Sequence, residues 1–353
     1  MVNILVTGGL GFIGSHIVDA LLADGACVRI LDNLHPGAHA GMPSADPAAE
    51  VIIGDLRDPE TVLSALRGID VVCHQAAMVG LGVNFADVRD YVSHNDQGTA
   101  TLLWGMDAAG FHGRMVLASS MVVYGEGGWR CTRDGQVAPP PRSTKMLASG
   151  RFDPLCPACG NDLEPEAVPE SAPADPRNVY AATKLHQEHL CAALARERNI
   201  PLTVLRYHNV YGPGMPRDTP YAGVASIFRS ALERGEAPQV FEDGRQVRDF
   251  VHVRDVARAN AVAIAASRPA VGAFNVASGE PHTIGEMAHA LWSATGGVAP
   301  VPVVCGRFRA GDVRHVFASP ERAARVLGFR ARVRFADGMR EFAGAALREP
   351  AGR

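Results

Sequence analysis

Short runs of apolar, mostly β-branched residues alternate with amphipathic stretches along the first part of the chain. The runs lie at residues 3–7, 28–31, 51–53, 71–73 and 115–117. Between the first two runs, Ile13, Ile17 and Leu21 recur at the spacing of one helix face. Strands that alternate with helices in this way predict an α/β fold built on a doubly wound parallel sheet.

Several of the predicted strands end at a polar residue. Asp32 follows the second strand, Asp55 the third, His74 the fourth and Ser119 the fifth. The carboxyl ends of parallel strands lie at one edge of a sheet, and folds of this class bind their ligands there. These side chains therefore mark the edge at which we expect the functional site.

A glycine-rich turn follows the first predicted strand, where residues 8–14 read GGLGFIG. Gly8 permits the tight turn, Gly11 lets backbone amides approach a pyrophosphate, and Gly14 lets the helix pack on the sheet. Asp32 follows about 20 residues later, where a carboxylate binds a ribose diol and repels a 2′-phosphate. NAD is thus favoured over NADP. The alternatives are a flexible turn and a plain strand-end aspartate.

A tyrosine and a lysine stand four residues apart in the run Tyr180–Lys184. Only two of the 34 basic residues are lysines, Lys145 and Lys184. At this spacing the two side chains share a helix face, and the ammonium favours the phenolate of a group whose free pKa is about 10. Such a pair suits removal of a proton from an alcohol. Ser120, at a strand end, offers a hydroxyl for the same substrate oxygen, although strand-end serines are more often turn residues.

With the glycine turn, Asp32, Ser120, Tyr180 and Lys184 in this order, the chain resembles the extended short-chain dehydrogenases/reductases. More narrowly, it resembles the NAD-dependent sugar-nucleotide epimerase/dehydratase family over nearly its whole length. The resemblance implies a catalytic triad of Ser120, Tyr180 and Lys184 and a tightly bound NAD. The residues it places at NAD are Gly8, Gly11, Phe12, Ile13, Gly14, Asp32, Asn33, Asp55, Leu56, Ala76, Asn95, Tyr180 and Lys184.

The resemblance also implies a domain organisation. Residues 1–205 are expected to form a Rossmann-type NAD-binding domain that carries an insertion at 127–177. Residues 206–353 are expected to form mainly a smaller C-terminal substrate-binding lobe, with segments near 250–276 returning to the Rossmann domain. A homodimer is expected to form through two long helices near 86–110 and 178–198.

In this family Tyr180 would take the proton of a sugar 4-hydroxyl while C4 passes a hydride to NAD. The two residues after the serine decide the fate of the resulting 4-keto sugar, because related dehydratases carry an Asp-Glu pair there. This chain has Met121 and Val122, which cannot act as acid or base. The expected activity is therefore 4-epimerisation of a UDP- or dTDP-hexose. The alternatives are an NAD-dependent 4-dehydrogenase or 4-ketoreductase and a non-catalytic NAD sensor.

Substrate residues are carried over from family motifs in the second half of the chain, together with Ser120. Asn209, Arg248 and Arg309 are expected at the diphosphate, where a guanidinium fork suits paired oxygens. Phe241 would flank the base, and Asp312 would accept from the nucleotide ribose. The alternative for each arginine is a solvated surface charge.

The insertion contains a metal-like pattern, in which Cys131 and Asp134 are followed by Cys156 and Cys159 in a Cys-Pro-Ala-Cys-Gly run. Three cysteines and one aspartate make a possible structural zinc site, and the alternative is a surface loop with reduced thiols. The insertion resembles that of a bacterial dTDP-L-rhamnose 4-epimerase-like subgroup. The remaining cysteines lie in apolar stretches and are predicted to be core residues: Cys27, Cys73, Cys191 and Cys305.

Composition narrows the function classes. The chain is 47% hydrophobic and 20% charged, with a net charge of -3, so neither a nucleic acid nor a membrane surface is expected as a partner. Seven cysteines in 353 residues do not make a disulfide scaffold, and the N-terminus shows no basic leader. A cytoplasmic protein that binds a nucleotide sugar is expected.

Overall fold

The computed structural model describes residues 2–80, 85–217, 223–309 and 311–349. Its centre is a seven-stranded sheet in the order β13-β9-β5-β4-β1-β2-β3, with every pair parallel. The strands are β1 (Asn3–Thr7), β2 (Cys27–Asp32), β3 (Glu50–Ile53), β4 (Val71–His74), β5 (Arg114–Ser120), β9 (Leu202–Tyr207) and β13 (Gly272–Val276). The predicted doubly wound sheet is confirmed, and its strand order reverses between β1 and β4, where such folds open a ligand crevice.

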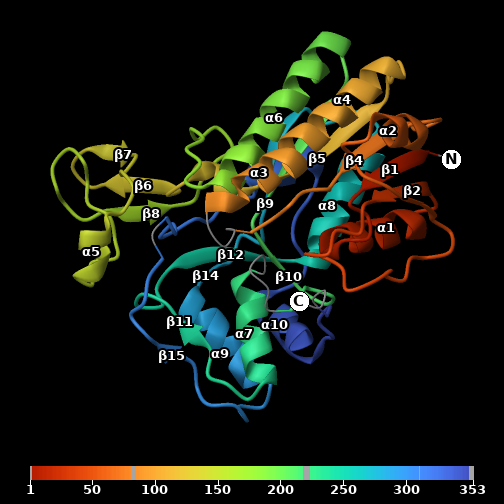
Figure 1. Ribbon diagram of the computed structural model, residues 1–353. Coiled ribbons are helices and arrows are strands. Elements are labelled where there is room, and N and C mark those ends of the chain that lie inside the picture. The colour runs from red at the N-terminus through yellow and green to blue at the C-terminus, as the bar shows by residue number, and fades with distance from the viewer. Residues whose placement is uncertain (1, 81–84, 218–222, 310, 350–353) are drawn as a thin grey trace.

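Helices cover both faces of the sheet (Figure 1). On one face, α1 (Phe12–Ala23) packs beside α8 (Val253–Ala265), and their apolar residues share a core with β1, β4 and β5. On the other face lie α2 (Pro59–Ala65), α4 (Gly98–Ala108) and α6 (Val179–Arg198). Because both faces are buried, the central strands read as continuous apolar runs.

The predicted long helix near 86–110 is present as a continuous helical run over residues 85–108. It begins with a 3₁₀ turn at Phe85–Asp87, continues as α3 (Val88–Tyr91) and includes a π-helical turn at Val92–Gln97 before α4. The π turn carries the fully buried Asn95, whose side chain is engaged by two other segments of the chain. Such turns are frequent at functional sites. The second predicted long helix, near 178–198, is present as α6.

A second lobe lies below the carboxyl edge of the sheet in Figure 1. Its strands are β10 (Asn209–Tyr211), β11 (Gln239–Val240), β12 (Val247–His252), β14 (Pro281–Thr283) and β15 (Val303–Val304). Its helices are α7 (Val224–Glu233), α9 (Ile284–Ala294) and α10 (Phe335–Gly344). Their buried apolar faces form a separate core.

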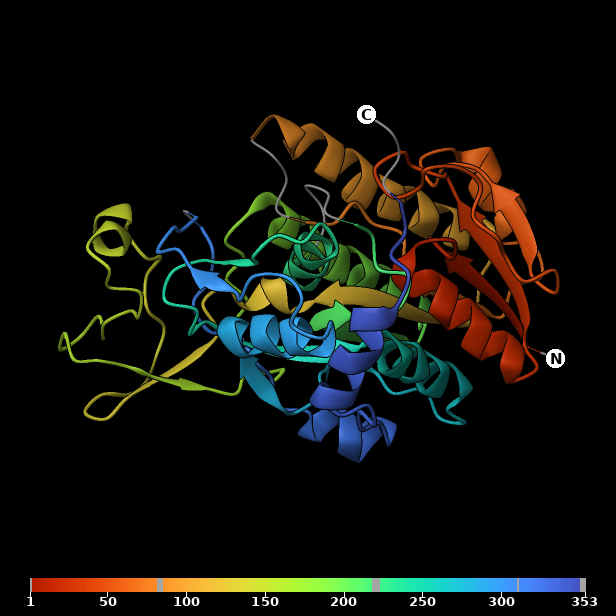
Figure 2. The same cartoon turned by 90° about the horizontal axis from the view of Figure 1, so that it is seen from below.

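The insertion forms an arm that projects from the body of the protein in both views (Figures 1 and 2). It contains a small antiparallel sheet of β6 (Gly128–Cys131), β7 (Gly135–Val137) and β8 (Glu164–Glu166), with the short helix α5 (Thr144–Ala148). Its core consists of the buried residues Trp129, Cys131, Cys156 and Leu163, with the partly buried Val137 and Cys159 packed against them. So small a core gives the arm little stability of its own.

The other cysteines differ in burial. Cys73 and Cys191 are buried as predicted and Cys305 is partly buried, whereas the prediction for Cys27 is wrong. Cys27 is exposed because it is the first residue of β2, at the end of the strand. Among the residues that the structure describes, no helix has the length and apolar character needed to cross a membrane.

Candidate active site

The glycine turn after β1 is shaped by close backbone contacts. Gly8 has φ +67°, and a Cβ there would lie 2.8 Å from the backbone of Ala76. A Cβ on Gly14 would lie 2.1 Å from the carbonyl oxygen of Gly8. Gly11 is the N-cap of α1 and offers no side-chain cap, so the first backbone N–H groups of α1 around Phe12 stay available for an anion.

Asp32, at the end of β2, is buried and faces this turn. Its carboxylate accepts hydrogen bonds from the backbone N–H groups of Leu10 (3.1 Å) and Leu34 (3.0 Å), and His39 Nε2 lies 3.5 Å away. Burial alone would raise the pKa of Asp32, but the contacts with His39, Leu34 and Leu10 bring that pKa below its usual value. The group is therefore an anion at the mouth of the crevice.

The next strand end carries a second anion. Asp55 pairs with Arg57 at 2.7 Å and accepts from Asn33 Nδ2 at 3.1 Å, and the Arg57 contact holds the pKa of Asp55 well below its usual range. Leu56 is buried beside Gly98. The structure thus brings Asn33, Asp55 and Leu56 together, and it adds Arg57, which the sequence pattern did not single out.

Asn95 uses its whole amide inside the protein. Its Oδ1 accepts from the Met78 N–H at 2.7 Å, and its Nδ2 donates to Met78 O and to Thr183 Oγ1, both at 3.0 Å. Asn95 therefore ties the segment after β4 to α6. In this state its side chain positions the site and has no remaining donor for a cofactor.

The three predicted catalytic residues converge at one edge of the sheet. Ser120 ends β5, and Tyr180 lies in the first turn of α6, which Asn178 caps by accepting from the Ala181 N–H at 2.8 Å. Lys184 is buried one turn later, and its Nζ donates to the carbonyl of Ala118 in β5 at 2.9 Å. This contact fixes α6 against the strand that delivers Ser120.

The electrostatics of the pair differ from the expectation. Burial raises the pKa of Tyr180 to about 12, and a hydrogen bond with Ser120 only partly opposes this rise. Burial also lowers the pKa of Lys184 to about 8, against the opposing influence of Cys191 and Glu188. Lys184 is directed at a backbone carbonyl, so in this state it does not bring Tyr180 toward neutral pH.

A buried chain of polar groups supports α6, and the sequence pattern did not predict it. Glu188 accepts from Arg206 in β9 through two hydrogen bonds, at 2.9 and 2.7 Å, and also from the hydroxyl of Ser119. Arg206 in turn donates to the Tyr124 hydroxyl at 2.9 Å. In the sequence, this network is indicated only by Glu188, one helical turn after Lys184. A single glutamate on a helix is expected to be a surface residue.

The short 3₁₀ turn after Ser120 holds the positions that decide the chemistry. It spans Met121–Tyr124, and Ser120 caps it by accepting from the Val122 N–H at 3.4 Å. Met121 packs against the apolar cluster of Val123, Tyr124 and Val168. Neither Met121 nor Val122 presents an acid or a base beside Ser120.

Two of the predicted substrate residues present groups that a ligand can use. Asn209 begins β10, and its buried Oδ1 has no hydrogen-bond partner within the described part of the chain. Phe241 follows β11, and the guanidinium groups of Arg307 and Arg309 lie 5.0 and 5.2 Å from its ring centre. A shallow surface depression is lined by Phe241, Cys305, Gly306, Arg307 and Phe308.

Arg248 is engaged differently from the prediction. It donates to the carbonyl oxygens of Val247 (2.9 Å), Arg314 (2.8 Å) and Val313 (2.7 Å), and burial lowers its pKa to about 10. Asp312 lies next to these carbonyls, and burial raises the pKa of its carboxyl group. Arg248 thus holds the loop that carries Asp312.

The predicted metal ligands Cys131, Asp134, Cys156 and Cys159 come together, with their ligand atoms all within 4.8 Å of one another. Asp134 Oδ2 lies 3.5 Å from Cys131 Sγ and 3.2 Å from Cys156 Sγ, and Cys131 Sγ lies 3.5 Å from Cys159 Sγ. The sulfur separation is far longer than a disulfide bond, which is about 2.05 Å. The contact with the Asp134 carboxylate raises the pKa of Cys159 to about 12.

Comparison with known proteins gives a consistent result. Residues 4–146 and 156–277 match the NAD dependent epimerase/dehydratase family. The dTDP-L-rhamnose 4-epimerase of Burkholderia thailandensis is 34% identical over 93% of this chain and 90% of its own. The UDP-glucose 4-epimerase of Thermotoga maritima, solved with UDP-glucose, superposes with a TM-score of 0.78 at 29% identity, covering 97% of both chains. The UDP-glucose 4-epimerase of Thermus thermophilus, solved with NAD, superposes with a TM-score of 0.76 at 31% identity. The match covers 98% of this chain and 100% of its own. The chain belongs to the NAD-dependent epimerase/dehydratase family.

Proposed function

We propose that this protein is an NAD-dependent sugar-nucleotide 4-epimerase that acts on a UDP- or dTDP-hexose. The observation that carries the proposal is that Ser120, Tyr180 and Lys184 lie together at the carboxyl edge of the sheet. The turn that follows Ser120 begins with Met121 and Val122, neither of which is acidic. Relatives named as 4-epimerases of dTDP-rhamnose and UDP-glucose support this reading.

The residues at the crevice fit NAD. The glycine turn is too crowded for a Cβ at Gly8 or Gly14, and the first turn of α1 offers free N–H groups for a pyrophosphate. Asp32 remains an anion that can accept from a ribose diol and repel a 2′-phosphate. When bound, NAD⁺ supplies a hydride acceptor and a positive charge.

The reaction requires a base at the sugar 4-hydroxyl. Tyr180 would accept that proton, and Ser120 would hold the same oxygen by a hydrogen bond. A phenol whose pKa burial raises to about 12 needs a positive charge nearby to ionise. The ammonium group of Lys184 has three N–H donors, and one of them donates to the carbonyl of Ala118. The other two could donate to the cofactor or to Tyr180.

The hydride is expected to return to the sugar because neither position after Ser120 carries an acid or a base that could drive elimination. Elimination needs a proton carrier after Ser120, and Met121 and Val122 are neither acids nor bases. A 4-keto sugar that turns over, takes the hydride back on its other face and recovers the proton of Tyr180 on its oxygen would become the C4 epimer. A 4-dehydrogenase or 4-ketoreductase would instead consume free cofactor in proportion to product.

The test is incubation of the purified protein with UDP- and dTDP-hexoses without added cofactor, followed by chromatographic separation of the C4 epimers. We expect one epimer to form from the other until both are present at equilibrium. In Tyr180→Phe the rate is expected to fall by at least about 10²-fold. Arg151→Gln, an exposed change in the arm, serves as the matched control.

We propose, in addition, that the cluster in the arm binds zinc. Zn–S bonds of about 2.3 Å place the sulfurs of a tetrahedral site about 3.8 Å apart, close to the 3.5 Å between Cys131 and Cys159. Zinc would stabilise an arm whose own core is small, and the reduced thiols fit the expected cytoplasmic location. Elemental analysis is expected to give one zinc per chain, lost in Cys156→Ser and retained in Cys27→Ser. A metal-free parent protein would contradict the site.

We further propose a homodimer that forms around α4 and α6. These helices pack side by side (Figure 1), and large apolar side chains are exposed along the segment before and within α4. They are Phe85, Val92 and Trp104, with exposed fractions of 78%, 45% and 50%. Burial of such residues favours association. Light scattering is expected to give twice the 37.4 kDa chain mass, and Trp104→Glu is expected to give monomers.

A further inference from the structure

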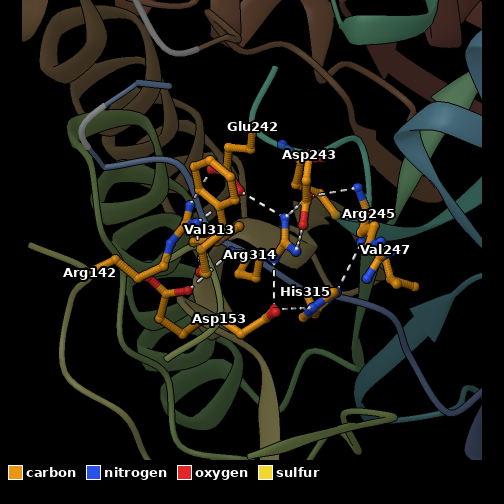
Figure 3. A network of polar contacts seen from close by, with 12 residues as sticks. Arg142, Asp153, Glu242, Asp243, Arg245, Val247, Val313, Arg314 and His315 are labelled. Carbon is orange, nitrogen blue, oxygen red and sulfur yellow. Dashed lines mark hydrogen bonds and ion pairs between the residues drawn. The ribbon is translucent and has the colours of Figure 1, made fainter. Parts of the chain in front are cut away.

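The arm contacts the second lobe through a network of charged side chains, of which Arg142, Glu242 and Arg314 are buried (Figure 3). Arg314, of which 1% is exposed, donates to Asp153 of the arm at 2.8 Å. It also donates to Asp243 at 2.7 and 2.8 Å and to Glu242 at 2.9 Å. The neighbouring His315 contacts the same Asp153 oxygen through Nε2 at 3.1 Å. Asp153 is thus the point at which the arm holds two consecutive residues of the lobe.

Arg142 makes a second connection from the arm. Its guanidinium donates to Glu242 at 3.0 Å and to the carbonyl oxygen of Asp312 at 2.7 Å. It also donates to the carbonyl of Phe152, next to Asp153. The side chains of Arg142 and Glu242 are 1% and 2% exposed. Removing one partner of such a buried pair leaves an uncompensated charge, so the network favours the present arrangement of arm and lobe.

Glu242 carries a backbone conformation that needs this support. It has φ +54°, which is unfavourable for a residue with a Cβ. Two arginines bind its carboxylate, and its N–H donates to the Arg307 carbonyl at 2.7 Å. Phe241 directly precedes Glu242, so this strained backbone lies next to the residue expected at the base.

The network borders the residues expected at the nucleotide. Phe241 adjoins Glu242, and the carbonyl of Asp312 is held by Arg142. Arg248 donates to the carbonyl of Arg314, the residue that Asp153 binds. The arm therefore reaches the base, ribose and diphosphate positions indirectly, through Glu242, Arg314 and the Asp312 backbone.

We propose that Arg142 and Asp153 are positioning residues for the nucleoside diphosphate part of the substrate. They would fix Phe241 and Asp312, the latter on the loop that Arg248 holds, in the arrangement that binds base and ribose. The inference rests on the proposed function, because it assumes that Phe241 and Asp312 hold a sugar nucleotide. The arm would then serve substrate binding, whereas proton and hydride transfer take place at the edge of the seven-stranded sheet.

The test is Asp153→Asn, which keeps the size of the side chain and removes the charge that faces Arg314 and His315. The side chain of Asp153 is 54% exposed, so the variant is expected to fold. We expect KM for the sugar nucleotide, and Kd for UDP or dTDP measured by calorimetry, to rise about tenfold, since about 1.4 kcal/mol of binding is lost. We expect kcat to change less than twofold and bound NAD to be unchanged.

Arg142→Gln is expected to act in the same direction, Asp153→Glu to recover part of the affinity, and Arg151→Gln to leave all parameters unchanged. A folded Asp153→Asn protein with wild-type Kd for the nucleoside diphosphate, or with a loss confined to kcat, would overturn the inference. So would a wild-type protein that binds neither UDP nor dTDP. A protein that binds one of them but epimerises no sugar would instead contradict the proposed function, and its Kd values would still decide the role of the arm.

Discussion

The pair between Glu188 and Arg206 makes a quantitative prediction about what holds the catalytic helix. Glu188→Ala removes both hydrogen bonds that Arg206 makes to the carboxylate and the one that Ser119 makes. Arg206 is 8% exposed, and it would keep only the Tyr124 hydroxyl and a backbone carbonyl as partners. A buried arginine left without its carboxylate costs about 3–5 kcal/mol.

That loss is a large share of a total stability of about 5–15 kcal/mol. We expect the thermal midpoint of Glu188→Ala to fall by roughly 4–7 °C, as followed by circular dichroism. Glu197→Ala, an exposed change on the same helix, is the matched control and is expected to shift it by less than about 2 °C. The double variant Glu188→Ala/Arg206→Met is expected to be more stable than Glu188→Ala, because it no longer buries an unpaired charge. A midpoint for Glu188→Ala equal to that of the control would refute the reasoning.

Further predictions concern the cofactor turn, its anion and acid stability. Gly14→Ala is expected to abolish NAD retention, measured by absorbance of the denatured supernatant, because its Cβ would lie 2.1 Å from the Gly8 carbonyl oxygen. Asp32→Ala is expected to weaken NAD binding by about tenfold and to reduce the preference for NAD over NADP, measured by fluorescence titration. Burial lowers the pKa of His74 to about 3, so between about pH 6.5 and 3 the unfolded chain binds a proton at this histidine and the folded chain does not. The free energy of unfolding is therefore highest above about pH 6.5 and decreases as pH falls toward 3. Thermal midpoints between pH 7.5 and 5 should decline less steeply in His74→Gln.

The parts that the sequence predicted well are encoded by residues close together in the chain. The strand runs and the glycine turn are local patterns, and the Tyr180–Lys184 pair lies within one turn of α6. Asp32 could be predicted because it ends the second strand, about 20 residues after the glycine turn. For such features the hydrophobic period and the spacing carry the needed information.

The features that the sequence did not reveal depend on contacts between distant segments. The π-helical turn inside the expected helix at 86–110 carries Asn95, whose side chain binds Met78 and Thr183. The pKa of Tyr180 is set by burial, which is a tertiary property. Arg142 and Asp153 gain their partners in the second lobe, about 100 and 160 residues later in the chain. The sequence pattern of the arm itself does not indicate these contacts with the second lobe.

The most direct test of the central claim is turnover of the purified protein without added cofactor. Wild-type protein is expected to interconvert the C4 epimers of a UDP- or dTDP-hexose with no net change in absorbance at 340 nm, and Tyr180→Phe is expected to lose this activity. Conversion that consumes NADH in proportion to product, or an unchanged rate in Tyr180→Phe, would contradict the account.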